Sequence, residues 1–132
     1  FLYIDIVNDN QKGCYAEYIF CTMAMEQNFN VCMPLLGASH YDCIVEKKGK
    51  LFKIQIKFIS KDRTKGRNNR YSEQCVLRTS GRYYKKEYVD FFALYHQQLN
   101  GFFIIPNIEQ KTIRIRADGI YKENFNNFDL IS

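Results

Sequence analysis

The stretch that decides the fold is residues 41–58, YDCIVEKKGKLFKIQIKF. Two runs that alternate apolar and polar residues flank the dipeptide Lys48-Gly49, a pattern that predicts a β-hairpin with a short turn. The register of such a hairpin, with a two-residue or a four-residue loop, places Asp42 directly opposite Gln55. The two predicted strands span residues 41–47 and 50–58.

Because side chains alternate along a strand, the predicted hairpin has an apolar face and a polar face. The apolar face, which we expect to pack on the core, carries Tyr41, Cys43, Val45, Phe52, Ile54, Ile56 and Phe58. The other face, which we expect to be open, carries Asp42, Ile44, Glu46, Leu51, Lys53, Gln55 and Lys57. The register therefore gathers an acid, an amide and a lysine on one side of the hairpin.

This grouping suits a hard divalent cation such as Mg²⁺, which prefers oxygen ligands. The Asp42 carboxylate, the Gln55 side-chain carbonyl and the Ile56 backbone carbonyl could supply three ligands, and Glu17 a further one. Lys57 would lie beside a bound water and a phosphate oxygen, where it could stabilise developing charge. On spacing alone, an ordinary solvated sheet face remains the alternative.

The rest of the chain predicts one helix followed by strands, which favours a mixed α/β sheet with the helix packed on it. The helix is expected over residues 11–28, capped by Asp9 or Asn10. Gly13 in its first turn suggests close approach of another backbone or of a ligand. The apolar stripe of this helix is Ala16, Ile19, Phe20, Met23 and Ala24. Further strands are expected at residues 30–33, 72–78, 91–95, 101–105 and 113–116, with a short strand or arm at residues 1–8 and an irregular Asn-rich tail.

Size and composition predict a single domain over residues 1–132. Hydrophobic residues make up 46% and charged residues 25%, and no apolar run is long enough to span a membrane. The first residues lack the pattern of a signal peptide, so we expect a cytoplasmic protein. Five cysteines without a CxxC pair predict reduced thiols rather than a zinc site or disulfides.

The formal net charge of +5 suits a negatively charged partner, and the basic residues are concentrated in two segments. These are KDRTKGRNNR, residues 61–70, and GRYYKKE, residues 81–87. Solvated loops are the alternative to DNA contact. The residues predicted to bind DNA are Lys61, Arg63, Lys65, Arg67, Arg70, Arg78, Arg82, Tyr83, Lys85 and Lys86, with Tyr84 also placed near DNA.

The two histidines attract attention as general bases. His40 lies just before Asp42, but a turn histidine is the simpler interpretation, and His96 is expected to be solvated at the start of a polar loop. No His–acid pair stands beside a Ser or Cys in a way that indicates a nucleophile.

The segments KGCYAEYIF (12–20) and GASHYDCIVEKKGKLFKIQIKF (37–58) resemble the PD-(D/E)xK nuclease superfamily, over about residues 12–58. The later YVDFFALYHQQLNGFFIIP (88–106) is similar to the closing strand pair of some members, more loosely. The resemblance implies a restriction-endonuclease-like mixed β-sheet core with an N-terminal helix packed on it. It matches Asp42 to the first acid, Gln55 to the second metal-ligand position, Lys57 to the lysine and Glu17 to the supporting glutamate.

Two residues depart from the superfamily pattern. Tyr41 replaces a proline that is not a ligand, and Gln55 replaces the usual acid, which removes a negative charge from the metal site. The Gln variant resembles the intron-encoded (group I) homing endonuclease branch. That resemblance implies a Mg²⁺-dependent enzyme, with Mn²⁺ as a substitute, that cuts double-stranded DNA as a homo-oligomer, a dimer or a tetramer.

Three functions stay open. The first is a site-specific homing or restriction-like endonuclease, which the polar and basic residues 61–86 favour mildly because base readout needs many polar side chains. The second is a structure-specific resolvase of the Holliday-junction type, with little sequence preference. The third is a catalytically silent DNA-binding domain of the same fold, for which Gln55 is the best support.

Overall fold

The structure is a computed structural model that describes residues 8–59, 63–65, 71–79 and 82–132. The predicted arm at residues 1–8 lies outside the described residues, except for Asn8. Helix α1 spans Asp9–Glu26. It begins and ends two residues earlier than predicted, because Asn8 is the cap: its Oδ1 accepts a hydrogen bond from the Gln11 amide at 2.8 Å. Asn28, at φ 67°, then turns the chain out of the helix.

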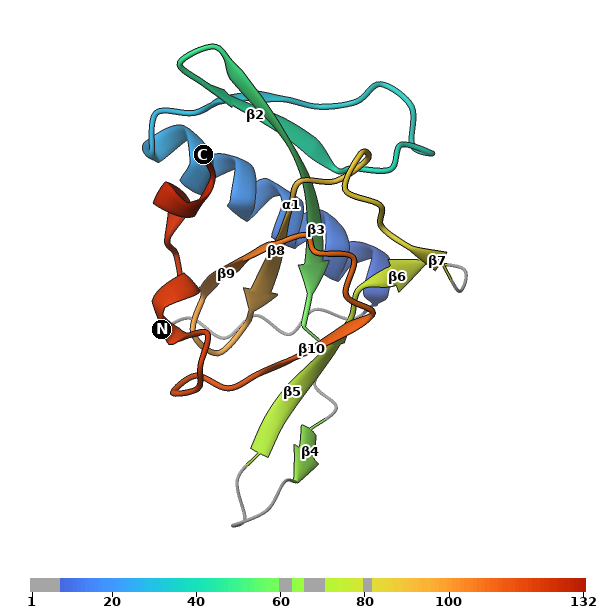
Figure 1. Cartoon of the computed structure of the whole chain (residues 1–132), viewed down its shortest axis with the longest axis vertical. Helices are drawn as coiled ribbons and strands as arrows, with labels where there is room; N and C mark the ends of the chain where they lie inside the picture. The colour runs from blue at the N-terminus through green and yellow to red at the C-terminus, as the bar shows by residue number, and fades with distance from the viewer. Residues whose placement is uncertain (1–7, 60–62, 66–70, 80–81) are drawn as a thin grey trace.

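A five-stranded sheet lies against α1, in the order β1-β2-β3-β8-β9 (Figure 1). β3 and β8 pair in parallel, whereas the other neighbours are antiparallel, so the mixed sheet predicted from the sequence is confirmed. The strands are β1 (Asn30–Cys32), β2 (Cys43–Lys47), β3 (Lys50–Phe58), β8 (Phe91–His96) and β9 (Gly101–Pro106).

The hairpin of β2 and β3 has the predicted register. Cys43 pairs with Ile54 and Lys47 with Lys50 around a two-residue turn. Lys48 and Gly49 both have positive φ, 54° and 80°, as a turn that matches the twist of the strands requires. β2 begins at Cys43, two residues later than predicted, because the chain leaves the ladder at Asp42.

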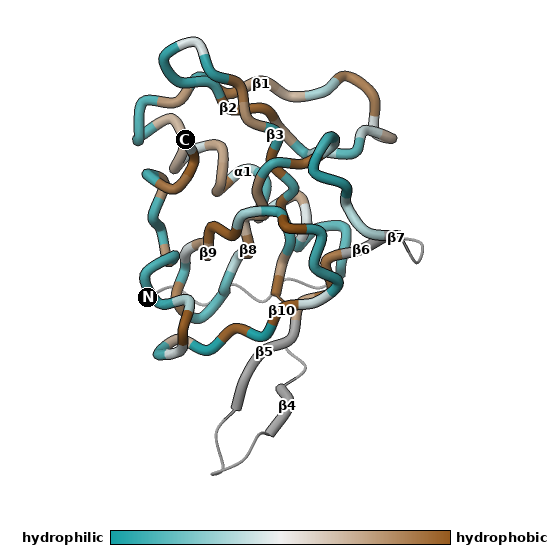
Figure 2. The backbone as a smooth tube through the Cα atoms, viewed as in Figure 1, coloured by the Kyte–Doolittle hydropathy of each residue, from teal (hydrophilic) through white to brown (hydrophobic). Residues whose placement is uncertain are grey.

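The helix side of the sheet is a continuous hydrophobic cluster. Ala16, Phe20 and Ala24 are fully buried, as the predicted stripe requires, and Ile19 and Met23 pack at its margin. The ring of Phe20 lies 5.3 Å from Phe102 in β9 and 5.5 Å from Phe128 near the C-terminus. Figure 2 shows hydrophobic residues concentrated in β9.

The Asn-rich tail is more ordered than predicted. It forms the short 3₁₀ helices η2 (Lys122–Asn124) and η3 (Phe128–Leu130), and Phe128 and Ile131 are buried in the helix-side cluster. Asn126 also accepts a hydrogen bond from the Phe102 amide at 2.9 Å. The prediction of an irregular tail was wrong because these contacts join segments that are far apart in the sequence.

The opposite side of the sheet is only partly open, which corrects the expectation of an open face. A further hydrophobic cluster covers β8 and β9 there, and it includes Leu77, Tyr84 and Val89. Tyr41 packs against this cluster rather than on the helix side as predicted.

The described residues also form two smaller sheets, with the orders β10-β5-β4 and β6-β7. Their strands are β4 (Arg63–Lys65), β5 (Tyr71–Val76), β6 (Arg78–Thr79), β7 (Arg82–Tyr83) and β10 (Thr112–Ile115).

Strand β5 ends at Val76, not at Arg78 as predicted, because Leu77 turns into the core while its amide still donates to the Lys111 carbonyl at 2.8 Å. The cysteines Cys14, Cys21, Cys32, Cys43 and Cys75 are free, as predicted. None of the helices in the described part of the chain has the length and hydrophobicity to span a membrane.

Candidate active site

Asp42 stands where β2 separates from β3. Its backbone amide still donates to the Ile54 carbonyl at 2.8 Å, but its carboxylate then takes the place of the next backbone partner: Oδ2 accepts the Ile56 amide at 2.6 Å. The side chain is half-buried and fixed at the edge of β3. A short hydrogen bond of an amide to a carboxylate is strong, so Asp42 is held in one orientation and keeps its other oxygen for another partner.

Glu17 reaches Asp42 from α1. Their side chains hydrogen-bond to each other, which brings together two carboxyl groups that lie far apart in the sequence. Burial, the negative charge of Asp42 and this hydrogen bond raise the pKa of Glu17 from 4.5 to about 7. Such a pair shares a proton near neutral pH, because two adjacent carboxylates cannot both ionise without cost.

The pKa of Asp42 is raised chiefly by burial. The Ile56 amide, the hydrogen bond to Glu17 and the positive charge of Lys57 oppose that shift, because each stabilises the carboxylate. The contribution of Lys57 shows that its ammonium group lies within electrostatic reach of Asp42. Glu17, Asp42 and Lys57 therefore form one electrostatically connected group.

Gln55 and Lys57 lie on the face of β3 away from the buried Ile54 and Ile56, as the register predicts. Lys57 is half-buried, and its Nζ lies 5.0 Å from the ring centroid of Tyr84. Gln55 is half-buried too. The structure thus brings Glu17 and Asp42 into contact and sets Lys57 within reach of the pair.

These residues fit a divalent metal ion through the chemistry of their donors. Two carboxyl groups that share a proton can exchange it for a cation, and a hard cation favours such oxygen ligands. Among the described residues no three His, Cys, Asp or Glu side chains converge, so further ligands would be the Gln55 amide oxygen and the Ile56 carbonyl. The Ile56 amide points at Asp42, and the carbonyl of a strand residue points to the same edge as its amide.

The model of a family described as PD-(D/E)XK endonuclease matches residues 7–129. The chain belongs to the PD-(D/E)XK endonuclease family. Among solved structures, a bacterial homing endonuclease, I-Ssp6803I, has a similar fold, with a TM-score of 0.71 and 20% sequence identity over 94% of this chain and 93% of that chain. A search of curated protein sequences found no match.

The fold of this PD-(D/E)XK endonuclease is the restriction-endonuclease-like α/β fold expected from the sequence, with an N-terminal helix on a mixed sheet. Membership implies DNA as the substrate, and nucleases of this family generally use divalent metal ions.

The predicted DNA-binding residues of the nuclease are placed unevenly. Tyr83 is 44% exposed, and Lys85 and Lys86 are exposed in the loop that follows β7. Tyr84, by contrast, is only 8% exposed, because its ring belongs to the hydrophobic cluster, and its predicted place near DNA stays a prediction. Arg63 and Lys65 lie in β4, Arg78 in β6 and Arg82 in β7, whereas Lys61, Arg67 and Arg70 lie outside the described residues.

The histidines of the nuclease have different surroundings. His40 is exposed and stacks on Tyr88, with ring centroids 4.1 Å apart, close in sequence to Asp42. His96 is buried rather than solvated as predicted, and its Nδ1 accepts the Leu99 amide at 3.2 Å.

The Cβ position of Gly13 has no described atom within 4 Å, which corrects the expectation that another backbone approaches it. A ligand there stays an untested alternative.

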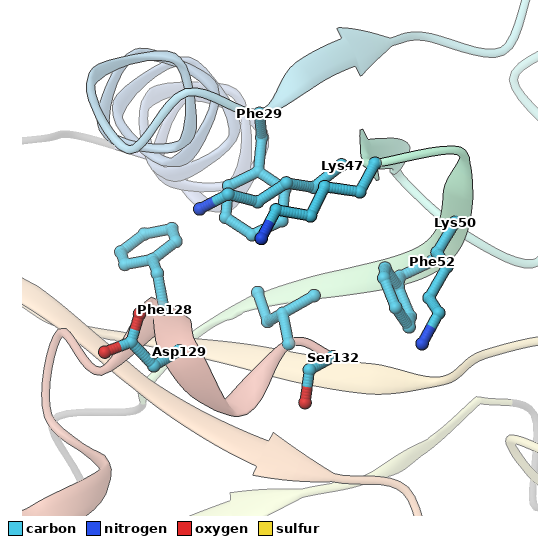
Figure 3. A pocket seen from close by; sticks show the side chains of 9 residues that line it. Phe29, Lys47, Lys50, Phe52, Phe128, Asp129 and Ser132 are labelled. Carbon is cyan, nitrogen blue, oxygen red and sulfur yellow. The ribbon is translucent and has the colours of Figure 1, made fainter.

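A pocket of about 250 Å³ lies at the turn between β2 and β3, at the opposite end of the hairpin from Asp42 (Figure 3). Lys47, Phe29 and Phe128 are among its lining residues, and none of the four candidate catalytic residues lines it. Lys47 is engaged locally, because its Nζ donates to the Gln27 carbonyl at 3.1 Å and lies 4.8 Å from the Phe29 ring. The candidate site at Asp42 therefore lies apart from this pocket.

Sequence reasoning missed the loop that supports Lys57. Asn107, which is 5% exposed, donates to the backbone carbonyls of Tyr84 and Val89 at 2.8 and 2.9 Å. Lys53 donates to the Glu87 carbonyl, and Asp90 accepts the Lys53 amide at 2.8 Å. The adjacent tyrosines within the second basic segment were the available signal, but a pair of tyrosines in a polar segment does not reveal which ring is buried.

Proposed function

We propose that this chain is a metal-dependent, site-specific DNA endonuclease, of the homing or restriction-like kind, that hydrolyses phosphodiester bonds of double-stranded DNA. The observation that carries the proposal is the contact of Glu17 with Asp42 within reach of Lys57. If these residues only formed a solvated sheet face, a carboxyl group of α1 would have no reason to lie against the carboxyl group of Asp42. The fold shared with a homing endonuclease supports the site-specific form of the activity.

Asp42, Gln55, the Ile56 carbonyl and Glu17 would hold the ion, for which we propose Mg²⁺ with Mn²⁺ as a substitute. The bound ion would polarise the phosphate and lower the pKa of a water molecule. Asp42 is suited to bind through Oδ1, because Oδ2 is engaged by the Ile56 amide. Gln55 binds without adding charge, so the negative charge of the site comes from Asp42 and Glu17.

Lys57 acts on the reacting groups. Its ammonium group orients the attacking water and stabilises the negative charge that develops on the phosphate oxygens. Its attraction to Asp42 keeps it next to the metal position, where the scissile phosphate would bind. Lys57 is thus the catalytic residue that does not bind the ion.

We further propose that the basic residues beyond β3 bind the DNA backbone. Lys85 and Lys86 are the exposed members of that set whose side chains are described, and the neighbouring Tyr83 is exposed beside them. Residues 1–132 would then form a single nuclease domain, which works in the cytoplasm as a homo-oligomer, a dimer or a tetramer, because cutting both strands of a duplex needs two active sites or a second encounter.

The test is to incubate the purified protein with a randomised duplex DNA library and Mg²⁺ or Mn²⁺, and to sequence the cut ends. Cuts that cluster at one sequence support the proposal, and an Asp42→Asn variant is the control that should cut nothing. If DNA is bound but never cut with either metal, nuclease activity is excluded, and the chain is a catalytically silent DNA-binding domain. The missing negative charge at Gln55 would then explain the lack of activity. Cutting of four-way junctions without sequence preference would instead indicate a resolvase.

A further inference from the structure

We propose that Tyr84 is a positioning residue for Lys57, and this inference rests on the function proposed above for Lys57. The ammonium Nζ of Lys57 lies 5.0 Å from the centroid of the Tyr84 ring. Within about 6 Å, the negative face of an aromatic ring attracts a cation. The positive charge of Lys57 is also attracted to the Asp42 carboxylate. The Tyr84 ring and the Asp42 carboxylate therefore both attract the Lys57 ammonium group.

The ring is fixed by the fold. Tyr84 is 8% exposed, and it meets Phe92 of β8 edge-on, with centroids 5.7 Å apart and an interplanar angle of 73°. The buried Asn107 binds the Tyr84 backbone carbonyl at 2.8 Å. Phe92, which packs on the Tyr84 ring, and Lys57, which the ring contacts, lie on the neighbouring parallel strands β8 and β3.

A lysine side chain has four rotatable carbon–carbon bonds and gains freedom when nothing packs on it. Loss of the ring would let Lys57 occupy rotamers that point away from the metal position. The attraction uses the face of the ring and not the phenol group, so phenylalanine should serve in place of tyrosine. A residue that only filled space could be replaced by leucine with little effect on Lys57.

The first experiment measures Lys57 directly, without DNA or metal. In protein labelled with ¹³C-lysine, and with the Lys57 signals assigned through a Lys57→Arg variant, the ring current of Tyr84 should move the ε-CH₂ protons upfield. That shift should persist in Tyr84→Phe and disappear in Tyr84→Leu. Phe125→Leu is the matched control, because Phe125 packs against the same hydrophobic cluster, on Phe103 at 5.1 Å.

The second experiment measures cleavage of the preferred DNA site. Tyr84→Leu should lower kcat about tenfold with little change in KM, since it disturbs a group that acts in the transition state. Tyr84→Phe should stay within about twofold of the wild type, as should Phe125→Leu.

The outcomes separate the two proposals. If wild-type protein cuts no DNA, the proposed function fails, and the ring-current shift still tests the placement of Lys57. Wild-type kcat in Tyr84→Leu, beside a loss of cleavage in Lys57→Ala, overturns the role of Tyr84 alone. If Tyr84→Leu does not fold, the absence of an upfield shift in the wild type, or low activity of folded Tyr84→Phe, overturns it instead.

Discussion

The carboxyl groups of Glu17 and Asp42 hydrogen-bond to each other, one from α1 and the other from the residue just before β2. Helix docking and hairpin register meet in this one contact. The helix brings Glu17 because Ala16 and Phe20 on either side of it are fully buried, and the hairpin brings Asp42 because the Ile56 amide binds its carboxylate. Displacement of either element would separate the pair.

Binding of Mg²⁺ should release a proton from this pair. The pKa of Glu17 is about 7, so the proton must leave when a cation takes its place. We expect the affinity to rise with pH up to about 7 and to level off above it. Calorimetric titrations at pH 6 in buffers of different ionisation enthalpy measure the protons released; Glu17→Gln should release fewer, and equal release from both proteins would contradict the assignment.

The stability of the metal-free protein should fall as the pH rises. The pKa of Glu17 is raised from 4.5 to about 7 on folding, so its contribution is fully present below pH 4.5 and is lost as the pH rises through 7. Urea denaturation in EDTA between pH 4.5 and 8 measures this loss. Glu17→Gln carries no titrating group and should show a flatter profile. A profile as steep as that of the wild type would assign the pH dependence to other groups.

Replacement of Lys57 by alanine should abolish most of the cleavage and keep DNA binding. Loss of one group that stabilises transition-state charge costs about 10²–10³ in kcat. Lys50→Ala is the matched control, because Lys50 is an exposed lysine at the other end of the same strand. The measurements are the cleavage rates and DNA-binding isotherms of the two variants. A wild-type cleavage rate for Lys57→Ala would show that Lys57 has no catalytic role.

The change Gln55→Glu should strengthen metal binding. It adds a negative charge where the family pattern has an acid, and a charge about 4 Å from an ion contributes about 1–4 kcal/mol, which is about fivefold or more in affinity. Cleavage measured against Mg²⁺ concentration should therefore reach half its maximum at lower Mg²⁺. The same isosteric substitution at another glutamine, Gln74→Glu in β5, adds the same charge and is the matched control. An unchanged Mg²⁺ dependence of Gln55→Glu would show that this side chain does not bind the ion.

The C-terminal 3₁₀ helix η3 should matter for stability. Phe128 is 4% exposed and stacks on Phe20, so Phe128→Ala should lower the free energy of unfolding by about 3–5 kcal/mol. Chemical denaturation measures the loss, and Leu130→Ala, at the margin of the same cluster, should cost less. If Phe128→Ala costs no more stability than Leu130→Ala, the Phe128 side chain does not anchor η3 in the core.

The hairpin could be predicted from the sequence because its determinants are local. The Lys48-Gly49 turn and the alternation of the flanking runs fix which residues pair, from Cys43 with Ile54 to Lys47 with Lys50. The predicted pair of Asp42 and Gln55 lies one residue beyond this ladder, where the Asp42 carboxylate accepts the Ile56 amide. The helix stripe around Phe20 is equally local. The choice of Glu17 depended on family resemblance, because no periodicity shows which turn of a helix docks against the end of a strand.

What could not be predicted depends on contacts between distant segments. The burial of Tyr84 requires β8 and Asn107, and the burial of His96 requires the arrangement of β8 and β9. Both residues stand in polar stretches of sequence, where exposure is the reasonable expectation. The same reason explains why the polar face of the hairpin looked open although a hydrophobic cluster covers its neighbours.

The two-residue turn at Lys48-Gly49 also has a practical meaning for protein engineering. An extra residue within β2 or β3 would exchange the faces of every side chain beyond it, and so move Asp42 or Lys57 away from the metal position. Extra residues between Lys48 and Gly49 can bulge into solvent, because both are exposed and the paired strands on either side keep their alignment. A peptide tag or a fluorescent label placed there would report on the protein while leaving its chemistry intact.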